Sequence, residues 1–265
     1  MDRQSTMRRG WSLNDSTRFS AMAAHERIYA SGANCPSRAP RLLTLAYETV
    51  SQVLMLGYKR NQVEEAISRV LEPRSKGPSA ELRTRLKRLL DTDRSDNSNG
   101  GASSYAFYSG APPGRGLEVW FSGYEAFALM TGLSLMNHSW PQGFVVSLLR
   151  EVRSELERQH ARILKQDPDV LFDEEAIRKS ARRGDMAVGN TDQVFLTIVS
   201  KSGAKPSEQS RPIESAVCRE RELWAVIQRT SQKGGACSML EIVNSAHQLA
   251  SCLANTEPQP RGRNS

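Results

Sequence analysis

Two helical patterns joined by a tight turn, between Ser122 and Lys165, constrain the fold of this chain more than any other stretch. Ser122 and Glu125 have the spacing of a capping box, in which each side chain satisfies a backbone N–H of the other. The apolar residues that follow recur at the period of one helix face. They are Phe127, Met130, Leu133 and Met136. We therefore expect a helix to begin at Ser122.

The second pattern follows the turn at residues 138–141 and predicts one long helix that ends before Pro168. Ser139 and Gln142 repeat the capping-box spacing, and Pro141 lies near a first-turn position, where its missing N–H costs nothing. Charges of both signs separate the apolar positions, as on a solvated surface. One face carries Val145, Leu148, Leu149, Val152, Leu156, His160, Ile163 and Leu164.

A helix, a short turn and a helix also form the outline of a DNA-reading unit. The alternative is a helical hairpin whose apolar stripes close a core. A helix this long suits packing, or self-association through residues 141–165, better than insertion into a groove. We therefore favour the hairpin interpretation.

The net charge of +7 is spread unevenly over the 265 residues. Residues 1–41 carry seven basic and three acidic side chains, and residues 42–94 carry ten and seven, whereas residues 167–200 carry four and seven. A basic first third favours an anionic partner, most commonly nucleic acid. Charge that serves only solubility is the equally weighted alternative.

Cysteine usage and hydropathy limit the cellular compartments in which we expect this protein. The four cysteines form no C-x-x-C pair and have no histidine at a metal-like spacing, which favours a reducing compartment and argues against a zinc site or a disulfide framework. The first fourteen residues lack the apolar region of a secretory signal, and no run approaches the length of a membrane span. We expect a cytoplasmic protein of bacterial type, with no metal, cofactor or membrane partner.

Residues 41–91 predict a bundle of three short helices, ended at Gly57 and Pro73 and reopened at Ser79. The Leu56-Gly57-Tyr58 turn, followed by Val63 and Ala66-Ile67, resembles the loop of UBA-like three-helix domains. It is also similar to the C-terminal domain of the bacterial branch-migration protein that binds Holliday junctions. This resemblance implies a protein-docking surface around Tyr58. The same stretch can also be interpreted as a helix-turn-helix, although Glu64 and Glu65 would then repel phosphate.

The third helix of this bundle is the better candidate for binding phosphate. Four basic residues fall within two turns: Arg83, Arg85, Lys87 and Arg88. We expect them to hold phosphates, with Arg60 and Gln142 approaching bases. The competing interpretation is an ordinary solvated amphipathic helix.

The central hairpin has a resemblance of its own. Tyr124, Leu133, the Ser139-Trp140 turn and Leu148-Leu149 resemble the middle of the MerR-type regulators, where a tyrosine, a helix, a Gly-Phe-Ser-like turn and a helix follow one another. The DNA-reading signature upstream of that region is missing here, so no DNA contacts carry over. A predicted β-hairpin over residues 186–199 is similar to the wing of winged-helix proteins, but its loop carries Asp192 and no basic residue.

The remaining patterns complete the expected organisation. Polar composition predicts a linker over residues 92–118, in which Tyr105, Phe107 and Tyr108 dock on a neighbour or stack on a base, with docking favoured. Ser238 and Glu241 have the capping-box spacing that would open the last helix. The expected N-terminal part consists of a largely disordered segment 1–40 with one short helix, the bundle 41–91 and the linker 92–118. Residues 119–200 are expected to hold the helical hairpin, a short helix and the β-hairpin. A linker 201–212, a helical pair 213–254 and a mobile tail 255–265 follow.

No catalytic or phosphate-binding motif occurs in the chain. The four histidines lie far apart, and His160 and His247 fall on apolar helix faces, where hydrogen-bonded core histidines are common. We therefore predict a mainly α protein that is a non-enzymatic nucleic-acid-associated or regulatory protein. The alternatives are a protein–protein interaction adaptor or homodimeric helical scaffold, and an enzyme whose site assembles from distant residues.

Overall fold

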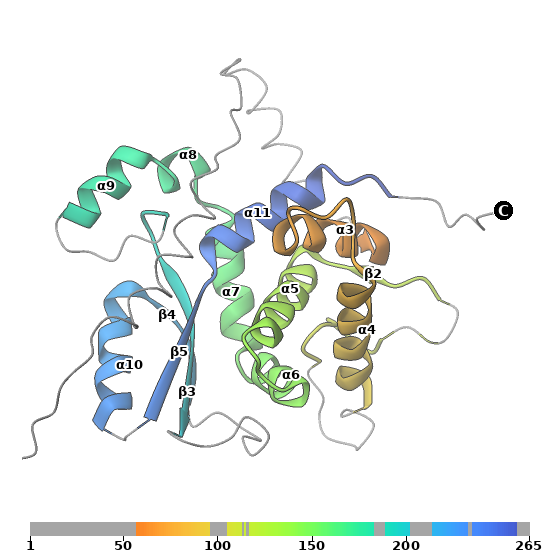
Figure 1. Ribbon diagram of the computed structural model, residues 1–265, viewed down its shortest axis with the longest axis horizontal. Helices are drawn as coiled ribbons and strands as arrows, with labels where there is room; N and C mark the ends of the chain where they lie inside the picture. Colours follow the sequence, from red (N-terminus) through yellow and green to blue (C-terminus); the bar gives the residue numbers. More distant parts are fainter. Residues whose placement is uncertain are drawn as a thin grey trace, which may run out of the picture. The chain divides into compact units, whose positions relative to one another are not determined.

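A helix covered on all sides, α5 (Gly123–Asn137), lies at the centre of the fold (Figure 1). The computed structural model describes residues 57–95, 105–112, 114, 117–182, 189–201, 214–232 and 235–258. Four predicted segments lie wholly or largely outside these described residues. They are the disordered segment 1–40, the first helix of the bundle, the linker 201–212 and the end of the tail. The described part is mainly helical, as the sequence predicts. It contains two small antiparallel sheets, where the sequence predicts a single β-hairpin.

The predicted start of α5 is confirmed in detail. Ser122 Oγ accepts a hydrogen bond from Glu125 N at 3.1 Å, and Glu125 Oε2 accepts one from Ser122 N at 2.7 Å. Eleven of the fifteen residues of α5 are buried, so apolar burial rather than surface amphipathicity defines this helix.

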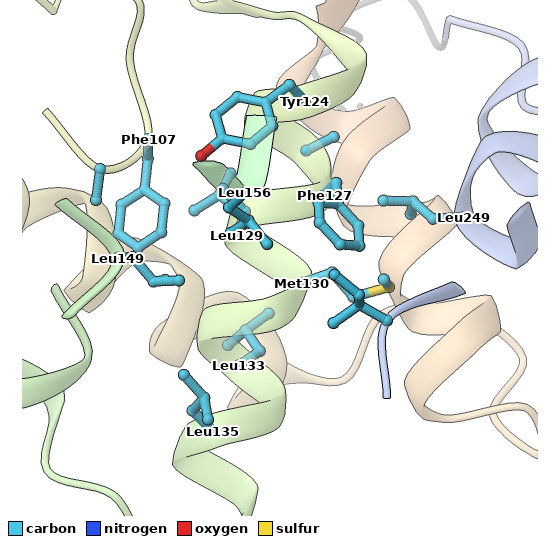
Figure 2. Packing of buried hydrophobic residues seen from close by; sticks show 14 of the residues in the cluster. Phe107, Tyr124, Phe127, Leu129, Met130, Leu133, Leu135, Leu149, Leu156 and Leu249 are labelled. Atoms are coloured by element: carbon cyan, nitrogen blue, oxygen red, sulfur yellow. The ribbon is translucent and has the colours of Figure 1, made fainter. Parts of the chain in front are cut away.

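Five helices pack around α5 (Figure 2). Near the beginning of the described chain are α3 and α4, and after α5 come α6, α7 and, much later, α11. Their bounds are Arg60–Leu71, Ala80–Ser95, Gln142–Glu151, Arg153–Ile163 and Val243–Ala254. Gly132 sits where three of these elements meet, since a Cβ there would lie 3.3 Å from methyl groups of both Leu89 and Leu149.

The long helix predicted for residues 141–165 is instead two helices, α6 and α7, separated at Val152. The ψ angle of Val152 is 1°, far from the helical value, and this bend keeps the apolar faces of both helices against the core. The capping box predicted at Ser139 is also wrong. Ser139 has a φ of 67° and ends α5 in a left-handed conformation, while Trp140 N–H donates to Leu135 O at 3.2 Å, as in the common glycine-type helix ending.

The segment 105–112, predicted as part of a linker, packs into the core. Ala106, Phe107 and Tyr108 are buried, so the favoured docking of these aromatic residues takes place within the chain. Asp93, at the end of α4, holds the segment: its carboxylate accepts hydrogen bonds from Ala106 N and Phe107 N, both at 3.0 Å. Arg150 of α6 neutralises this fully buried carboxylate at 2.8 Å.

Two antiparallel sheets accompany the helices. β1 (Tyr58–Lys59) pairs with β2 (Trp120–Phe121) beside α3. The larger sheet has the order β4-β3-β5, in which the central strand β3 (Val194–Lys201) is flanked by β4 (Glu214–Arg219) and β5 (Gly235–Glu241). The predicted strand 194–199 is thus confirmed as part of β3, whereas residues 186–188, its predicted hairpin partner, lie outside the described residues.

Both strands that flank β3 come from stretches predicted as helical. β4 precedes the helix α10 (Glu220–Gln232), and β5 contains Ser238, where the sequence predicts that the last helix opens. That helix, α11, begins at Val243. Glu241 still caps it, because its carboxylate accepts hydrogen bonds from Val243 N at 2.7 Å and Asn244 N at 3.2 Å.

Burial of β3 on both faces explains its apolar sequence. Leu196 and Ile198 join the helical core on one face, whereas Phe195 and Val199 pack with Leu223 and Val226 of α10 on the other. Two further short helices, α8 (Pro168–Leu171) and α9 (Glu174–Arg182), lie between α7 and the sheet in the sequence, and α9 buries no residue. None of the helices in the described part of the chain is both long and apolar enough to cross a bilayer.

Removing the ring of Phe107 tests whether the 105–112 segment is part of the core. Phe107 is fully buried. We therefore expect Phe107→Ala to lower the free energy of unfolding by about 3–5 kcal/mol, measured by denaturant titration. The matched control is Leu117→Ala, since Leu117 is 65% exposed in the same connection. That substitution should change stability by less than about 0.5 kcal/mol. Equal effects of the two substitutions would contradict this placement.

Candidate nucleic-acid interface

Helix α4 presents an apolar face to the core and a basic face to solvent. Its start is defined by Ser79, whose Oγ accepts a hydrogen bond from Leu82 N at 3.0 Å. The buried face consists of Leu82, Leu86, Leu89, Leu90 and Asp93. The exposed basic side chains of α4 and of the turn before it are Arg74, Lys76, Arg83, Lys87, Arg88 and Arg94.

Some of the basic residues predicted from sequence are neutralised by carboxylates. Arg85 forms an ion pair with Glu81 at 2.8 Å and donates to Asn137 Oδ1 at 2.5 Å. Arg83 is weakly paired, since its Nε lies 3.7 Å from a Glu64 oxygen. Arg60 pairs with the same Glu64 at 2.8 Å along α3, so its guanidinium is already engaged.

The remaining basic residues of this region have no carboxylate partner in the part of the chain that the structure describes. Among the described residues, no carboxylate oxygen lies within 4.0 Å of the charged groups of Arg74, Lys76, Lys87, Arg88 or Arg94. Arg94 instead lies over the ring of Tyr108, 5.5 Å from its centroid, which leaves its charge unneutralised. Elsewhere, of the basic side chains that the structure describes, only Lys165 and Arg182 lack a carboxylate partner. Within the described residues, unneutralised positive charge is therefore concentrated on α4 and its preceding turn.

Gln142 and Tyr58, which the sequence predicts as binding residues on the surface, both contact other parts of the protein. Gln142 Nε2 donates to Arg88 O at 3.1 Å and to Thr92 Oγ1, which fastens the start of α6 to α4. Tyr58 is half-buried in β1, where it packs against the core and burial raises the pKa of its hydroxyl. Neither side chain extends freely from the surface.

Three basic residues of this candidate interface are not predicted from the sequence. Arg94 lies seven residues after Lys87, two helical turns along the same face, and that periodicity could have identified it. Arg74 and Lys76 lie outside any helix, in the turn between α3 and α4, where a periodic pattern gives no signal.

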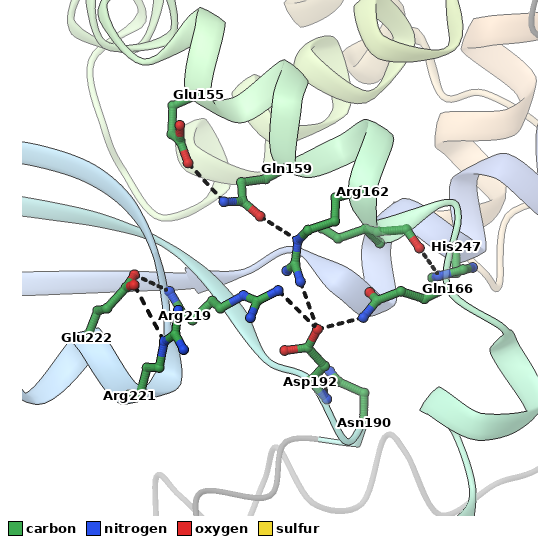
Figure 3. A network of polar contacts seen from close by, with 11 residues as sticks. Glu155, Gln159, Arg162, Gln166, Asn190, Asp192, Arg219, Arg221, Glu222 and His247 are labelled. Atoms are coloured by element: carbon green, nitrogen blue, oxygen red, sulfur yellow. Dashed lines mark hydrogen bonds and ion pairs between the residues drawn. The ribbon is translucent and has the colours of Figure 1, made fainter.

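A second polar cluster connects α7 to the sheet (Figure 3). Asp192 Oδ2 accepts hydrogen bonds from Arg162 at 3.0 Å and Gln166 at 2.5 Å, and Arg219 of β4 lies 3.9 Å from the same oxygen. Two guanidinium groups thus surround one carboxylate. Asp192 serves as an internal anchor here.

Buried titratable groups lie next to this cluster. Burial raises the pKa of Glu241 to about 7, against the opposing effect of hydrogen bonds from Val243 N, Asn244 N and Asn190. Burial, with a smaller contribution from His247, lowers the pKa of His160 to about 4, and its ring stacks on Phe127 with centroids 4.6 Å apart. His160 is therefore a core histidine, as expected. Within the described residues, no group of three or more potential metal ligands is found.

Comparison with known proteins identifies no relative: no protein-family model matches the chain, and neither a curated protein nor a solved structure does so. The function must therefore be inferred from the geometry of the described residues.

The raised pKa of Glu241 makes stability depend on pH. The folded state holds its proton up to about pH 7, whereas the unfolded chain releases it near 4.5, so the contribution of this group is complete below 4.5 and is lost as the pH rises to 7. We expect Glu241→Gln to remove this loss. Its unfolding free energy relative to wild type should rise by on the order of 2 kcal/mol between pH 4.5 and 7.5, measured by urea titration.

His160 titrates in an overlapping window with the opposite sign, because its contribution is lost as the pH falls from 6.5 to 4. That effect is common to both proteins and cancels in their difference. A difference between Glu241→Gln and wild type that does not vary with pH would show that Glu241 ionises normally.

Proposed function

We propose that this chain is a non-enzymatic nucleic-acid-associated protein that contacts the phosphate backbone through α4 and the turn before it. The observation that supports this proposal is the distribution of ion pairs. Most described basic side chains have a carboxylate partner, whereas five residues between positions 74 and 94 have none and are exposed. Cations that are not neutralised within the protein are available to displace counterions from a polyanion.

The dimensions of α4 suit a row of phosphate contacts. A helix of sixteen residues spans roughly 24 Å. Lys87 and Arg94, two turns apart on one face, are separated by roughly 10 Å along the axis. Competing carboxylates nearby are mostly engaged: Glu81 pairs with Arg85, and Glu72 accepts hydrogen bonds from the side chain and backbone of Ser79. Asp91 is the exposed exception.

The same geometry favours binding with little sequence specificity. Arg60 and Gln142, the two residues proposed to approach bases, are bound within the protein by Glu64 and by α4. Phosphate contacts position a protein on nucleic acid but do not read its sequence. We therefore infer that α4 recognises the charge and shape of the backbone.

Charge reversal on α4 tests this function. We expect the full chain to bind short duplex DNA with an affinity that falls as salt rises, measured by fluorescence anisotropy at several ionic strengths. Lys87→Glu/Arg88→Glu should weaken binding at least about tenfold. It should also reduce the slope of log affinity against log salt by about 0.9 for each phosphate that is no longer bound.

The matched control is Lys165→Glu/Arg182→Glu, which makes the same change in net charge at two described basic residues outside this region for which the structure describes no carboxylate partner. This variant should bind nearly as well as wild type, and circular dichroism should show that both variants remain folded. Equal weakening by the two variants would mean that only net charge matters. Binding of wild type that does not depend on salt would rule out the interface.

A further inference from the structure

The outer edge of β5 carries backbone groups that point away from the sheet. β5 lies at one end of the strand order β4-β3-β5. Ile242 N–H donates to Val194 O at 3.0 Å, which fixes the alternation of the antiparallel ladder. By that alternation, Leu240 and Ser238 bond to β3, whereas the N–H and C=O groups of Cys237 and Met239 face outwards. No strand in the described part of the chain pairs with this edge.

This edge lacks the features that usually prevent strand addition. The sequence Gly-Ala-Cys-Ser-Met-Leu-Glu contains no lysine, arginine or proline, the residues that commonly blunt an edge strand. Its one charge, on Glu241, is held by the N-terminus of α11 and by Asn190. The opposite edge differs, because α7 contacts β4 and Glu151 of α6 accepts a hydrogen bond from Ser215 at 3.1 Å.

Large apolar side chains are exposed beside the β5 edge. Met239 is 46% exposed and Trp224, on α10, is 61% exposed. Trp224 lies on the side of α10 nearest β5, because the opposite side is fixed to β4 by Arg229 and Glu222. Gln228 and Ser231, which follow Trp224 on this side of α10, are uncharged, whereas Glu220 and Arg221, one turn before Trp224, carry opposite charges.

We propose that the β5 edge pairs antiparallel with the β5 edge of a second copy of this chain, so that two three-stranded sheets form one six-stranded sheet. Pairing centred on Ser238 places Cys237 opposite Met239 of the other copy, and Gly235 opposite its Glu241. No like charges then face each other along the strands. The strand edge is thus complementary to itself, as a two-fold interface requires.

The spacing of the sheet leaves room for the two tryptophan side chains. In the joined sheet the two β3 strands would be three strand spacings apart, about 14 Å. One α10 covers each half on the same face, and helices in direct contact pack at about 8–10 Å. The remaining gap of roughly 5 Å is filled by Trp224 and Met239 from both copies, which removes from water the apolar side chains that a single copy exposes.

Sedimentation of the full chain over a range of concentrations tests this pairing. We expect a monomer–dimer equilibrium, and we expect Met239→Lys to raise the dissociation constant at least about tenfold, because lysine on an edge strand opposes pairing. The control is Val170→Lys, which places the same charge on another exposed apolar position, in α8, and should leave the dimer intact.

A cysteine at the two-fold axis tests the register. The two copies of residue 238 would form a non-hydrogen-bonded pair with Cα atoms about 4.5 Å apart, within the range of a disulfide. We expect Ser238→Cys to give a disulfide-linked dimer under mild oxidation in higher yield than wild type. A chain that stays monomeric, a dimer that Met239→Lys does not weaken, or the absence of this cross-link would overturn the proposal. A monomer that binds extended peptides would instead assign the edge to another protein.

Discussion

The burial of α5 on every side is the constraint on which the rest of the structure depends. A helix with apolar residues all around it must be covered by other elements, and α3, α4, α6, α7 and α11 together provide that cover. The one carboxylate near its start, Glu125, is used for capping and for binding Ser109. Every other helix in contact with α5 can therefore be amphipathic, with its apolar face on α5 and its polar face toward solvent.

The polar faces that remain differ in how their charges are balanced. On α7 and α9, glutamates one turn away neutralise Arg158, Arg178 and Lys179. Largely buried arginines such as Arg150 and Arg162 compensate internal carboxylates and connect segments distant in sequence. On α4 the positive charges are not fully compensated, because this helix has fewer carboxylates than basic side chains. Lys87 and Arg88 in particular have no carboxylate partner in the described part of the chain, and the proposed interface rests on this imbalance.

Local sequence signals predict much of the helical architecture. The strands that depend on pairing with distant residues could not be predicted from such signals. The capping box at Ser122 and the leucine spacing after Ser79 depend on neighbours within a few residues, and both were confirmed. β4 and the second half of β5 lie in stretches predicted as helical, because Val217 fits the period of the helix that follows it and Ser238 and Glu241 have the capping-box spacing. Only pairing with β3 decides against both predictions. For the candidate site, the cluster at Arg83 to Arg88 could be predicted from sequence. The engagement of Arg60 and Gln142 could not, because it depends on the positions of Glu64 and of α4 in space.

The contact between α11 and α3 has a consequence for how this protein is made. α3 is the first described helix and α11 the last, yet they pack together, and Gln62 donates a hydrogen bond to Thr256 O at 2.8 Å. A contact across nearly two hundred residues forms slowly, because closing a long loop costs chain entropy before the contact compensates for it. During synthesis, the part of α3 that packs on α11 therefore stays uncovered until α11 has left the ribosome, whereas α4 and α5, which are made earlier, can already cover the rest of its apolar face.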